Sequence, residues 1–251
     1  MKIQSRLAFV FVLLSVFASG CSLVGGGGDV VGFPDIDLGV DVVVYHETPE
    51  RDLHLHLFEP AAADADRPAV LFFHGGGFAA TRVEQFERQA QLVADAGMVG
   101  VIVEYRVTAE GTTRDDAVFD GAVALDYVMS NAADFGIDPD RVAMAGASAG
   151  GALATVAVDR VGPPTAGALV LFNPAVSSGS ADFAGSVPTI VFHSREDTIV
   201  DFSNAEAFCD AVSQCELVAF DEGDHGFFND DPAFTETVEA MMTFFTNLGW
   251  A

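Results

Sequence analysis

The chain has 251 residues, of which 50% are hydrophobic, and its 37 acidic residues outnumber 11 basic ones to give a formal net charge of −26. This length and composition fit one domain with a substantial core and exclude a disordered chain. The charge excludes nucleic-acid binding, because phosphate groups would be repelled. The acidic residues are scattered, which is consistent either with a surface adapted to high salt or with an acidic exported protein.

The N-terminal segment, residues 1–20, is predicted to be a signal peptide, because basic residues precede an apolar run too short to span a bilayer. Small residues then lead to Cys21, a pattern that resembles a lipoprotein signal whose cysteine becomes the lipidated first residue. An ordinary signal peptide cut near Gly20 is the alternative. Residues 21–39, which include four consecutive glycines, are predicted to form a lipid-anchor tether and linker. We therefore expect an exported cell-envelope lipoprotein, or otherwise a secreted protein, with a catalytic domain over residues 40–251.

Apolar patterning in the rest of the chain predicts an antiparallel hairpin followed by repeated strand–helix units. Strands are expected at Val40–Tyr45, Leu53–Phe58, Ala69–Phe73, Met98–Glu104, Val142–Ala145, Ala166–Phe172, Val187–His193 and Glu216–Phe220. Helices are expected at Arg82–Gly97, Asp115–Ala133, Leu153–Arg160, Ser203–Val212 and Asp231–Leu248. This order predicts an α/β fold with a mostly parallel sheet of about eight strands and helices on both faces. His54 and His56 alternate with leucines in the hairpin and are expected to face solvent rather than to bind a metal.

A Gly-x-Ser-x-Gly motif at residues 146–150 lies between an apolar strand and a helix. This setting is typical of a nucleophile elbow, in which a tight turn lifts the hydroxyl of Ser148 above the end of the sheet. Side chains at Gly146 and Gly150 would collide with the neighbouring strand or helix. The alternative is a glycine-rich turn with a buried, inactive serine.

A second glycine motif, His-Gly-Gly-Gly-Phe at residues 74–78, directly follows the strand that ends at Phe73. Three glycines allow backbone N–H groups to point at a ligand oxygen with no side chain in the way. Gly76 and Gly77, together with Ala149 after the serine, are therefore predicted to donate to an oxyanion.

A serine hydroxyl needs a base, and the chain order serine, acid, histidine favours His225, just past the last strand. Asp197, after the strand that ends at His193, is the best-placed acid to orient the imidazole. Glu196 and Asp201 are the competing acids. All these segments follow strand ends, where ligand sites of such sheets lie.

Several further residues have candidate roles. Phe78, Val176, Phe183 and Phe227 are predicted to line a substrate pocket, with core packing as the alternative. Cys209 and Cys215 can form a disulfide in an exported protein, or remain as buried thiols. No metal, nucleotide or flavin motif is present, so no cofactor is expected.

Taken together, the glycine motif at residues 74–78, Tyr105 with Arg106, the segment 136–151, and the Asp and His motifs resemble the α/β-hydrolase fold. Within that fold the chain is similar to the hormone-sensitive-lipase-like and the feruloyl- or acetyl-xylan-esterase-like carboxylesterases. The resemblance implies a triad of Ser148, Asp197 and His225, and oxyanion donors at Gly76, Gly77 and Ala149.

No stretch is long enough for a sizeable cap domain, so an open, shallow site is expected. The expected reaction is the cleavage of short-chain carboxylic esters through an acyl-enzyme, with acetyl or feruloyl groups of polysaccharides as candidate substrates. The alternatives are an amide- or peptide-cleaving hydrolase and a non-catalytic surface lipoprotein that binds a ligand. The expected partner is an ester substrate, and the only expected membrane contact is the lipid anchor.

Overall fold

The computed structural model describes residues 36–62, 65–161 and 166–251. The predicted signal peptide, Cys21 and most of the predicted tether lie outside the described residues. Within the described ranges, no helix is both long and apolar enough to cross a membrane.

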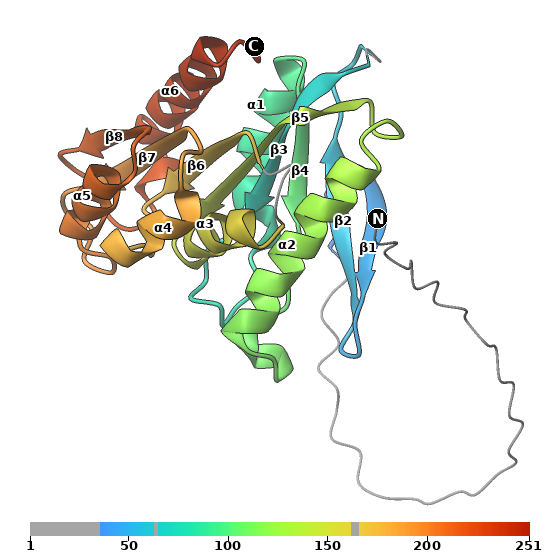
Figure 1. Cartoon of the computed structure of the whole chain (residues 1–251), viewed down its shortest axis with the longest axis horizontal. Helices are drawn as coiled ribbons and strands as arrows, with labels where there is room; N and C mark the ends of the chain where they lie inside the picture. Colours follow the sequence, from blue (N-terminus) through green and yellow to red (C-terminus); the bar gives the residue numbers. More distant parts are fainter. Residues whose placement is uncertain (1–35, 63–64, 162–165) are drawn as a thin grey trace, which may run out of the picture. The chain divides into compact units, whose positions relative to one another are not determined.

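Eight strands form one sheet in the order β1-β2-β4-β3-β5-β6-β7-β8 (Figure 1). The β1–β2 and β2–β4 pairs are antiparallel and all others are parallel. The strands are β1 Asp41–Glu47, β2 Asp52–Phe58, β3 Arg67–Phe73, β4 Val99–Val103, β5 Ile137–Ala147, β6 Ala168–Phe172, β7 Thr189–Ser194 and β8 Cys215–Phe220. The predicted mostly parallel sheet with an N-terminal antiparallel hairpin is confirmed.

Helices cover both faces of this sheet (Figure 1). Side chains of α2, α3, α4 and α5 share one buried cluster with one face, and those of α1 and α6 share a second cluster with the other. The α-helices are α1 Glu87–Asp95, α2 Arg114–Ser130, α3 Ala149–Val161, α4 Ala181–Ala184, α5 Phe202–Ala211 and α6 Ala233–Asn247. Short 3-10 helices are η1 Val83–Phe86, η2 Thr108–Glu110, η3 Ser178–Ser180 and η4 Phe227–Asn229. No separate cap domain is present among these elements.

A group of phenylalanines packs together in the α1/α6 layer. Phe172 at the end of β6 has ring centroids 5.1 Å from Phe192 of β7, 4.9 Å from Phe228 and 5.4 Å from Phe86. Phe86 in turn stacks on Phe72 of β3 at 5.2 Å. Such aromatic pairs bury large areas with defined geometry. Their packing therefore holds the ends of β3, β6 and β7 in fixed positions on this face of the sheet.

Three local predictions differ from the structure. β5 begins at Ile137, before the predicted start at Val142, because Arg67 of β3 pairs with Ile137 and donates its N–H to the Gly136 carbonyl at 3.0 Å. The predicted helix Arg82–Gly97 is divided into η1 and α1. His56, predicted to face solvent, is only 1% exposed because Glu104 accepts its hydrogen bond.

Candidate active site

Ser148 lies between β5 and α3, at the turn where a strand passes directly into a helix. Its φ of 50° is in the left-handed region, which non-glycine residues seldom occupy. A methyl group at Gly150 would overlap the carbonyl oxygens of Phe73 and His74, and one at Gly146 would overlap the Gly150 backbone. The glycines therefore allow β3, β5 and α3 to approach closely enough to present Ser148 at the sheet edge.

The structure brings three side chains from three loops into one hydrogen-bonded row. His225 Nε2 lies 2.9 Å from Ser148 Oγ, and His225 Nδ1 lies 2.7 Å from Asp197 Oδ2. Because the carboxylate can only accept, Nδ1 carries the imidazole proton and Nε2 is left to accept from the serine hydroxyl. This arrangement can remove a proton from Ser148.

Asp197 is held in place by its own loop. Its Oδ1 accepts the N–H groups of Ile199 at 2.8 Å and Val200 at 3.0 Å. Burial alone would raise the pKa of this carboxyl, but the bonds from His225 and from the two peptide N–H groups keep the pKa below its ordinary value. Of the competing acids, Glu196 accepts from Gly223 N and Asp201 caps α5 through Ser203 N.

His193, at the end of β7, is a partner of Asp197 that the sequence analysis missed. Its Nε2 lies 3.2 Å from Asp197 Oδ2 and 3.0 Å from the Val200 carbonyl. Burial lowers the pKa of His193, so the ring is neutral and its proton sits on Nε2 between two acceptors. The spacing of four residues between His193 and Asp197, just after a strand, was the available signal.

The glycine loop at residues 74–78 is fixed by two further residues that sequence analysis did not assign. Gln85 Oε1 accepts the Gly75 N–H at 2.6 Å, and Tyr105 donates its hydroxyl to the His74 carbonyl at 2.6 Å. The His74 ring stacks on Tyr105 with centroids 4.3 Å apart, and burial lowers the pKa of His74 to about 4. His74 is therefore a neutral packing group at the base of the loop.

The predicted oxyanion donors remain available beside the serine. Gly76 and Gly77 have positive φ values of 119° and 65°, and their N–H groups bond to none of the described residues. Ala149 is the first residue of α3, where a helix leaves its N–H without an intrahelical partner. A methyl group at Gly75 would lie 3.4 Å from Ser148 Cβ, so the glycine loop adjoins the elbow.

The four predicted pocket residues are distributed over both layers. Phe78 and Val176 are buried in the α2–α5 cluster, and Phe183 on α4 is 38% exposed. Phe227 is buried in the opposite cluster, where its ring packs 4.8 Å from Phe220. A substrate pocket lined by these four residues stays a prediction.

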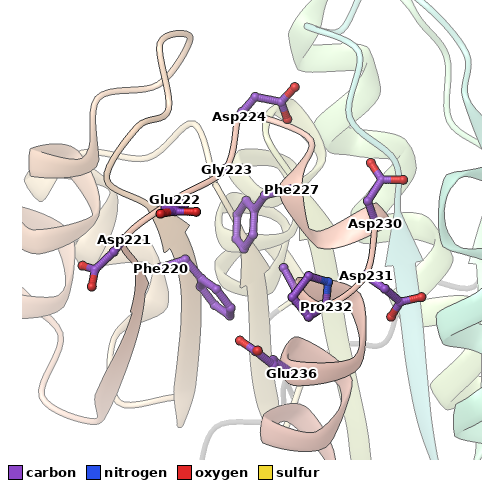
Figure 2. Close-up of a pocket in the computed structure, with 11 residues that line it drawn as sticks. Phe220, Asp221, Glu222, Gly223, Asp224, Phe227, Asp230, Asp231, Pro232 and Glu236 are labelled. Carbon is purple, nitrogen blue, oxygen red and sulfur yellow. The ribbon is translucent and has the colours of Figure 1, made fainter.

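An acidic cavity of about 510 Å³ borders the loop that carries His225 (Figure 2). Its acidic lining residues are Asp221, Glu222, Asp224, Asp230, Asp231 and Glu236. Their carboxylates diverge around the rim in Figure 2, and no cluster of three or more metal-binding side chains occurs in the described part of the chain. The cavity does not include Ser148.

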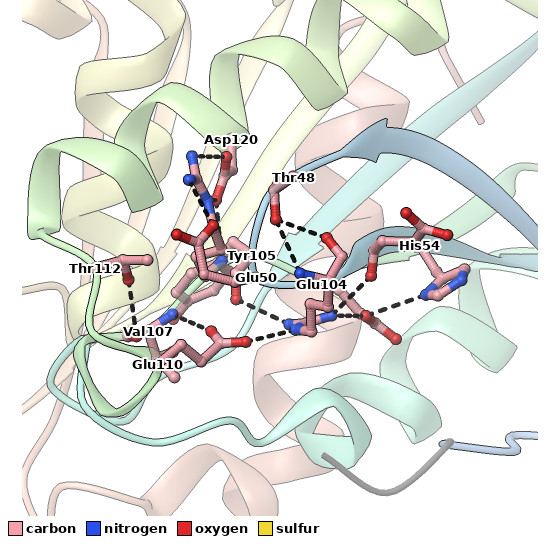
Figure 3. A network of polar contacts seen from close by, with 12 residues as sticks. Thr48, Glu50, His54, Glu104, Tyr105, Val107, Glu110, Thr112 and Asp120 are labelled. Atoms are coloured by element: carbon pink, nitrogen blue, oxygen red, sulfur yellow. Dashed lines mark hydrogen bonds and ion pairs between the residues drawn. The ribbon is translucent and has the colours of Figure 1, made fainter. Parts of the chain in front are cut away.

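A second polar cluster lies at the hairpin, and Figure 3 shows the part of it around His54, Glu104 and Glu110. Arg51 forms ion pairs with Glu104 and with Glu110, the latter at 2.6 Å. Glu104 also contacts His56 Nε2 at 3.0 Å and His54 Nδ1 at 3.3 Å. Burial would raise the pKa of Glu104, but the His56 bond and the Arg51 charge lower it to about 2.

Cys209 of α5 and Cys215 of β8 are joined by a disulfide. The bond ties the end of α5 to the start of the edge strand, away from Ser148.

Comparison with known proteins places these features in a family. Residues 70–179 match the family described as α/β hydrolase fold. Esterase 2 of Thermogutta terrifontis, solved after phosphorylation by paraoxon, superposes with a TM-score of 0.81 and 30% identity over 88% of this chain and 98% of that one.

Two curated relatives match over shorter segments. Carboxylesterase NlhH of Mycobacterium tuberculosis is 34% identical over 45% of this chain and 37% of its own length. Ethyl acetate hydrolase of Pseudomonas putida is 30% identical over 58% of this chain and 44% of its own length. The chain thus spans less than half of either curated relative but nearly all of the solved esterase. The chain belongs to the α/β-hydrolase fold family.

Proposed function

We propose that this protein is a serine carboxylesterase in which Ser148, His225 and Asp197 act as the catalytic triad. The observation that carries the proposal is the continuous row from Ser148 Oγ through both ring nitrogens of His225 to Asp197 Oδ2, with distances of 2.9 and 2.7 Å. Esterase relatives that share the fold support the same reaction class.

In this mechanism Ser148 Oγ attacks the ester carbonyl carbon while His225 Nε2 accepts the hydroxyl proton. The carbonyl oxygen becomes an oxyanion that the N–H groups of Gly76, Gly77 and Ala149 stabilise. The C–O bond to the alcohol then breaks, and the alcohol leaves with the proton from Nε2. Water repeats the sequence on the acyl-enzyme, so that the acid is released and Ser148 regains its proton.

Asp197 stabilises the imidazolium that forms in both steps. Its charge is supported by peptide N–H groups and imidazoles, so it stays ionised and ready to interact with the charged ring. His193 adds a neutral donor to the same carboxylate oxygen.

The substrates we propose are short-chain esters, including acetyl or feruloyl groups displayed on polysaccharides. The described ranges contain no cap domain, which favours an open site over a roofed tunnel. One relative is named ethyl acetate hydrolase, and ethyl acetate is an ester with a two-carbon acyl group. This name supports the proposal of short-chain substrates.

The test compares wild type with Ser148→Ala on p-nitrophenyl acetate, butyrate and octanoate. We expect turnover that falls with chain length, and a loss of about 10⁴-fold or more in the variant. Paraoxon should add one diethylphosphoryl group to wild type and none to Ser148→Ala, by intact-protein mass. A wild type that prefers p-nitroacetanilide would indicate an amidase, and one that neither turns over nor takes the label would indicate a non-catalytic binding protein.

We also propose that the enzyme is exported and anchored at Cys21, on the basis of the small residues before that cysteine. The test is fractionation of cells that express the full chain. Wild type should sediment with membranes and Cys21→Ala should not. Equal sedimentation of both proteins would contradict the anchor.

A further inference from the structure

Asn173, directly after β6, is buried at 1% exposure and has no part in the mechanism above. Its φ is 36°, and only four described non-glycine residues have a positive φ: Asp66, Phe78, Ser148 and Asn173. Three of these four, Phe78, Ser148 and Asn173, lie in the segments that follow β3, β5 and β6. Unusual backbone conformations persist only where the surroundings enforce them, and they concentrate at functional sites.

The backbone on both sides of Asn173 is bonded to the nucleophile elbow. Ser148 donates its N–H to the Phe172 carbonyl at 3.0 Å, and Ala175 donates its N–H to the Ser148 carbonyl at 2.9 Å. Asn173 itself donates its N–H to the Phe192 carbonyl of β7 at 2.7 Å. The residue is therefore fixed relative to Ser148 and to the strand that leads to Asp197.

The side chain of Asn173 contacts His225, the proposed catalytic base. Its Nδ2 donates to the backbone carbonyl of His225 and lies 2.8 Å from His225 Nδ1. Since Nδ1 donates its proton to Asp197, the amide hydrogen is used on the carbonyl. A reversed amide would set its oxygen against that carbonyl oxygen, so the donor orientation is the favourable one.

The oxygen of the Asn173 amide indicates that this residue does more than stabilise the fold. Asn173 Oδ1 is buried and bonds to no residue in the described ranges. A buried acceptor without a partner is unfavourable for folding. An aliphatic or smaller residue at this position would avoid that cost. The presence of an amide is therefore best explained by the bond from its Nδ2 to the His225 carbonyl.

The other side-chain bonds of the loop that carries His225 lie at Gly223 and Gly226, on either side of that residue. Ser194 Oγ donates to the Gly223 carbonyl at 2.6 Å, and Asp224 caps the following turn through Gly226 N at 2.8 Å. Neither bond reaches residue 225. The Asn173 amide is the side-chain contact that fixes the His225 backbone itself.

We propose that Asn173 is a positioning residue that aligns the His225 imidazole with both Ser148 and Asp197. The inference rests on the proposed esterase function. The imidazole must meet two partners at once, and small displacements of a reacting group are costly to the rate. Asn173 connects the turn at Ser148, the strand that leads to Asp197 and the loop that carries His225. The three catalytic side chains therefore keep fixed positions relative to one another.

Asn173→Gly is the first test variant, because glycine tolerates the positive φ and removes the side chain that carries the amide. We expect kcat/KM on p-nitrophenyl acetate to fall by about 10- to 100-fold, mostly in kcat. Asn131→Gly is the matched control, because Asn131 Nδ2 also donates to a backbone carbonyl, that of Tyr127 at 2.7 Å, at the end of α2. The control should lose stability and keep kcat/KM per folded enzyme.

Asn173→Asp is the second variant and supplies a readout that a structural role would not move. It keeps the shape but places a carboxylate beside the imidazole, which favours the protonated ring that cannot accept the serine proton. We expect the acidic limb of the kcat/KM profile to shift to higher pH.

The outcomes separate the two proposals. Full activity in Asn173→Gly, or an unchanged pH profile in Asn173→Asp, would overturn the positioning role while the esterase function stands. Failure of both variants to fold, with Asn131→Gly folded, would make the role structural and also overturn it. A wild type without turnover or paraoxon labelling would overturn the proposed function and this inference with it.

Discussion

Two buried carboxylates in this molecule each contact two histidines but differ in their remaining partners. Glu104, in the hairpin cluster, is bonded to the guanidinium of Arg51 and to two histidines. Asp197, at the catalytic edge, is bonded to two peptide N–H groups and to the imidazoles of His193 and His225. Both carboxyls have lowered pKa values, but only Glu104 has a permanent cation beside it.

This difference separates a structural carboxylate from one that can act. A carboxylate paired with a guanidinium has its charge compensated in every state of the protein. A carboxylate oriented by neutral donors retains a charge that interacts most strongly when His225 becomes an imidazolium. The chain has only 11 lysines and arginines, and two of them, Arg51 in the hairpin turn and Arg106 after β4, pair with the buried carboxylates of Glu104 and Asp120.

The largest expected effect on kcat comes from neutralising Asp197, the carboxylate proposed to act in catalysis. Asp197→Asn should lower kcat by about 10⁴-fold, because the amide no longer fixes the proton on His225 Nδ1 or stabilises the imidazolium. Steady-state kinetics on p-nitrophenyl acetate measures this. Glu104→Gln is the matched control and should change kcat per folded enzyme by less than about tenfold. Equal losses in both variants would contradict the comparison.

The converse experiment removes the cation from the hairpin cluster. Arg51→Met leaves Glu104 and Glu110 buried without their guanidinium, and we expect a loss of about 3–5 kcal/mol in the free energy of unfolding. Urea unfolding at pH 7.5 measures this loss. The pH profile of kcat/KM should keep its shape, and a displaced profile would show that the hairpin cluster acts on the triad.

Two buried groups, His74 beside Ser148 and Glu104 in the hairpin cluster, should respond to acid in different pH windows. The pKa of His74 is about 4 in the folded protein against an ordinary value of 6.5, so the unfolded chain takes up a proton first. Stability should fall by roughly 3 kcal/mol as pH drops from 6.5 to 4, and this group contributes no further loss below 4. Glu104 shifts from 4.5 to about 2, so its contribution is complete above pH 4.5 and is lost between 4.5 and 2.

His74→Phe isolates the upper window, because phenylalanine keeps the ring beside Tyr105 and cannot titrate. Urea midpoints measured from pH 7.5 to 4.5 should depend less on pH in this variant than in wild type. Identical slopes would contradict the assignment of the upper window to His74.

Local motifs were enough to predict the outline of the fold and the candidate triad. The Gly-x-Ser-x-Gly and triple-glycine motifs each combine a strand end with a steric requirement, and chain order selects among the acids and histidines. The partners of these groups could not be found in that way. Gln85 lies in a segment with ordinary helical patterning, and its contact with Gly75 exists only because η1 packs beside the glycine loop. His56 alternates like a solvent-facing residue, yet Glu104 arrives from the end of β4 to bury it.

The smallest expected effect tests whether the glycine loop follows the same principle as Asp197, with neutral groups as supports. Gln85→Ala removes the acceptor of the Gly75 N–H but leaves the Tyr105 bond to the His74 carbonyl. We expect kcat to fall by about tenfold with little change in KM, because a looser loop weakens contacts that matter most when the oxyanion forms. Gln91→Ala is the control on α1, since Gln91 donates to the exposed Asp95 at the helix surface. If Gln85→Ala retains wild-type kcat, the Gly75 bond is dispensable, and the Tyr105 hydroxyl and the Thr108 N–H, which donates to the Phe78 carbonyl at 2.7 Å, hold the loop without it.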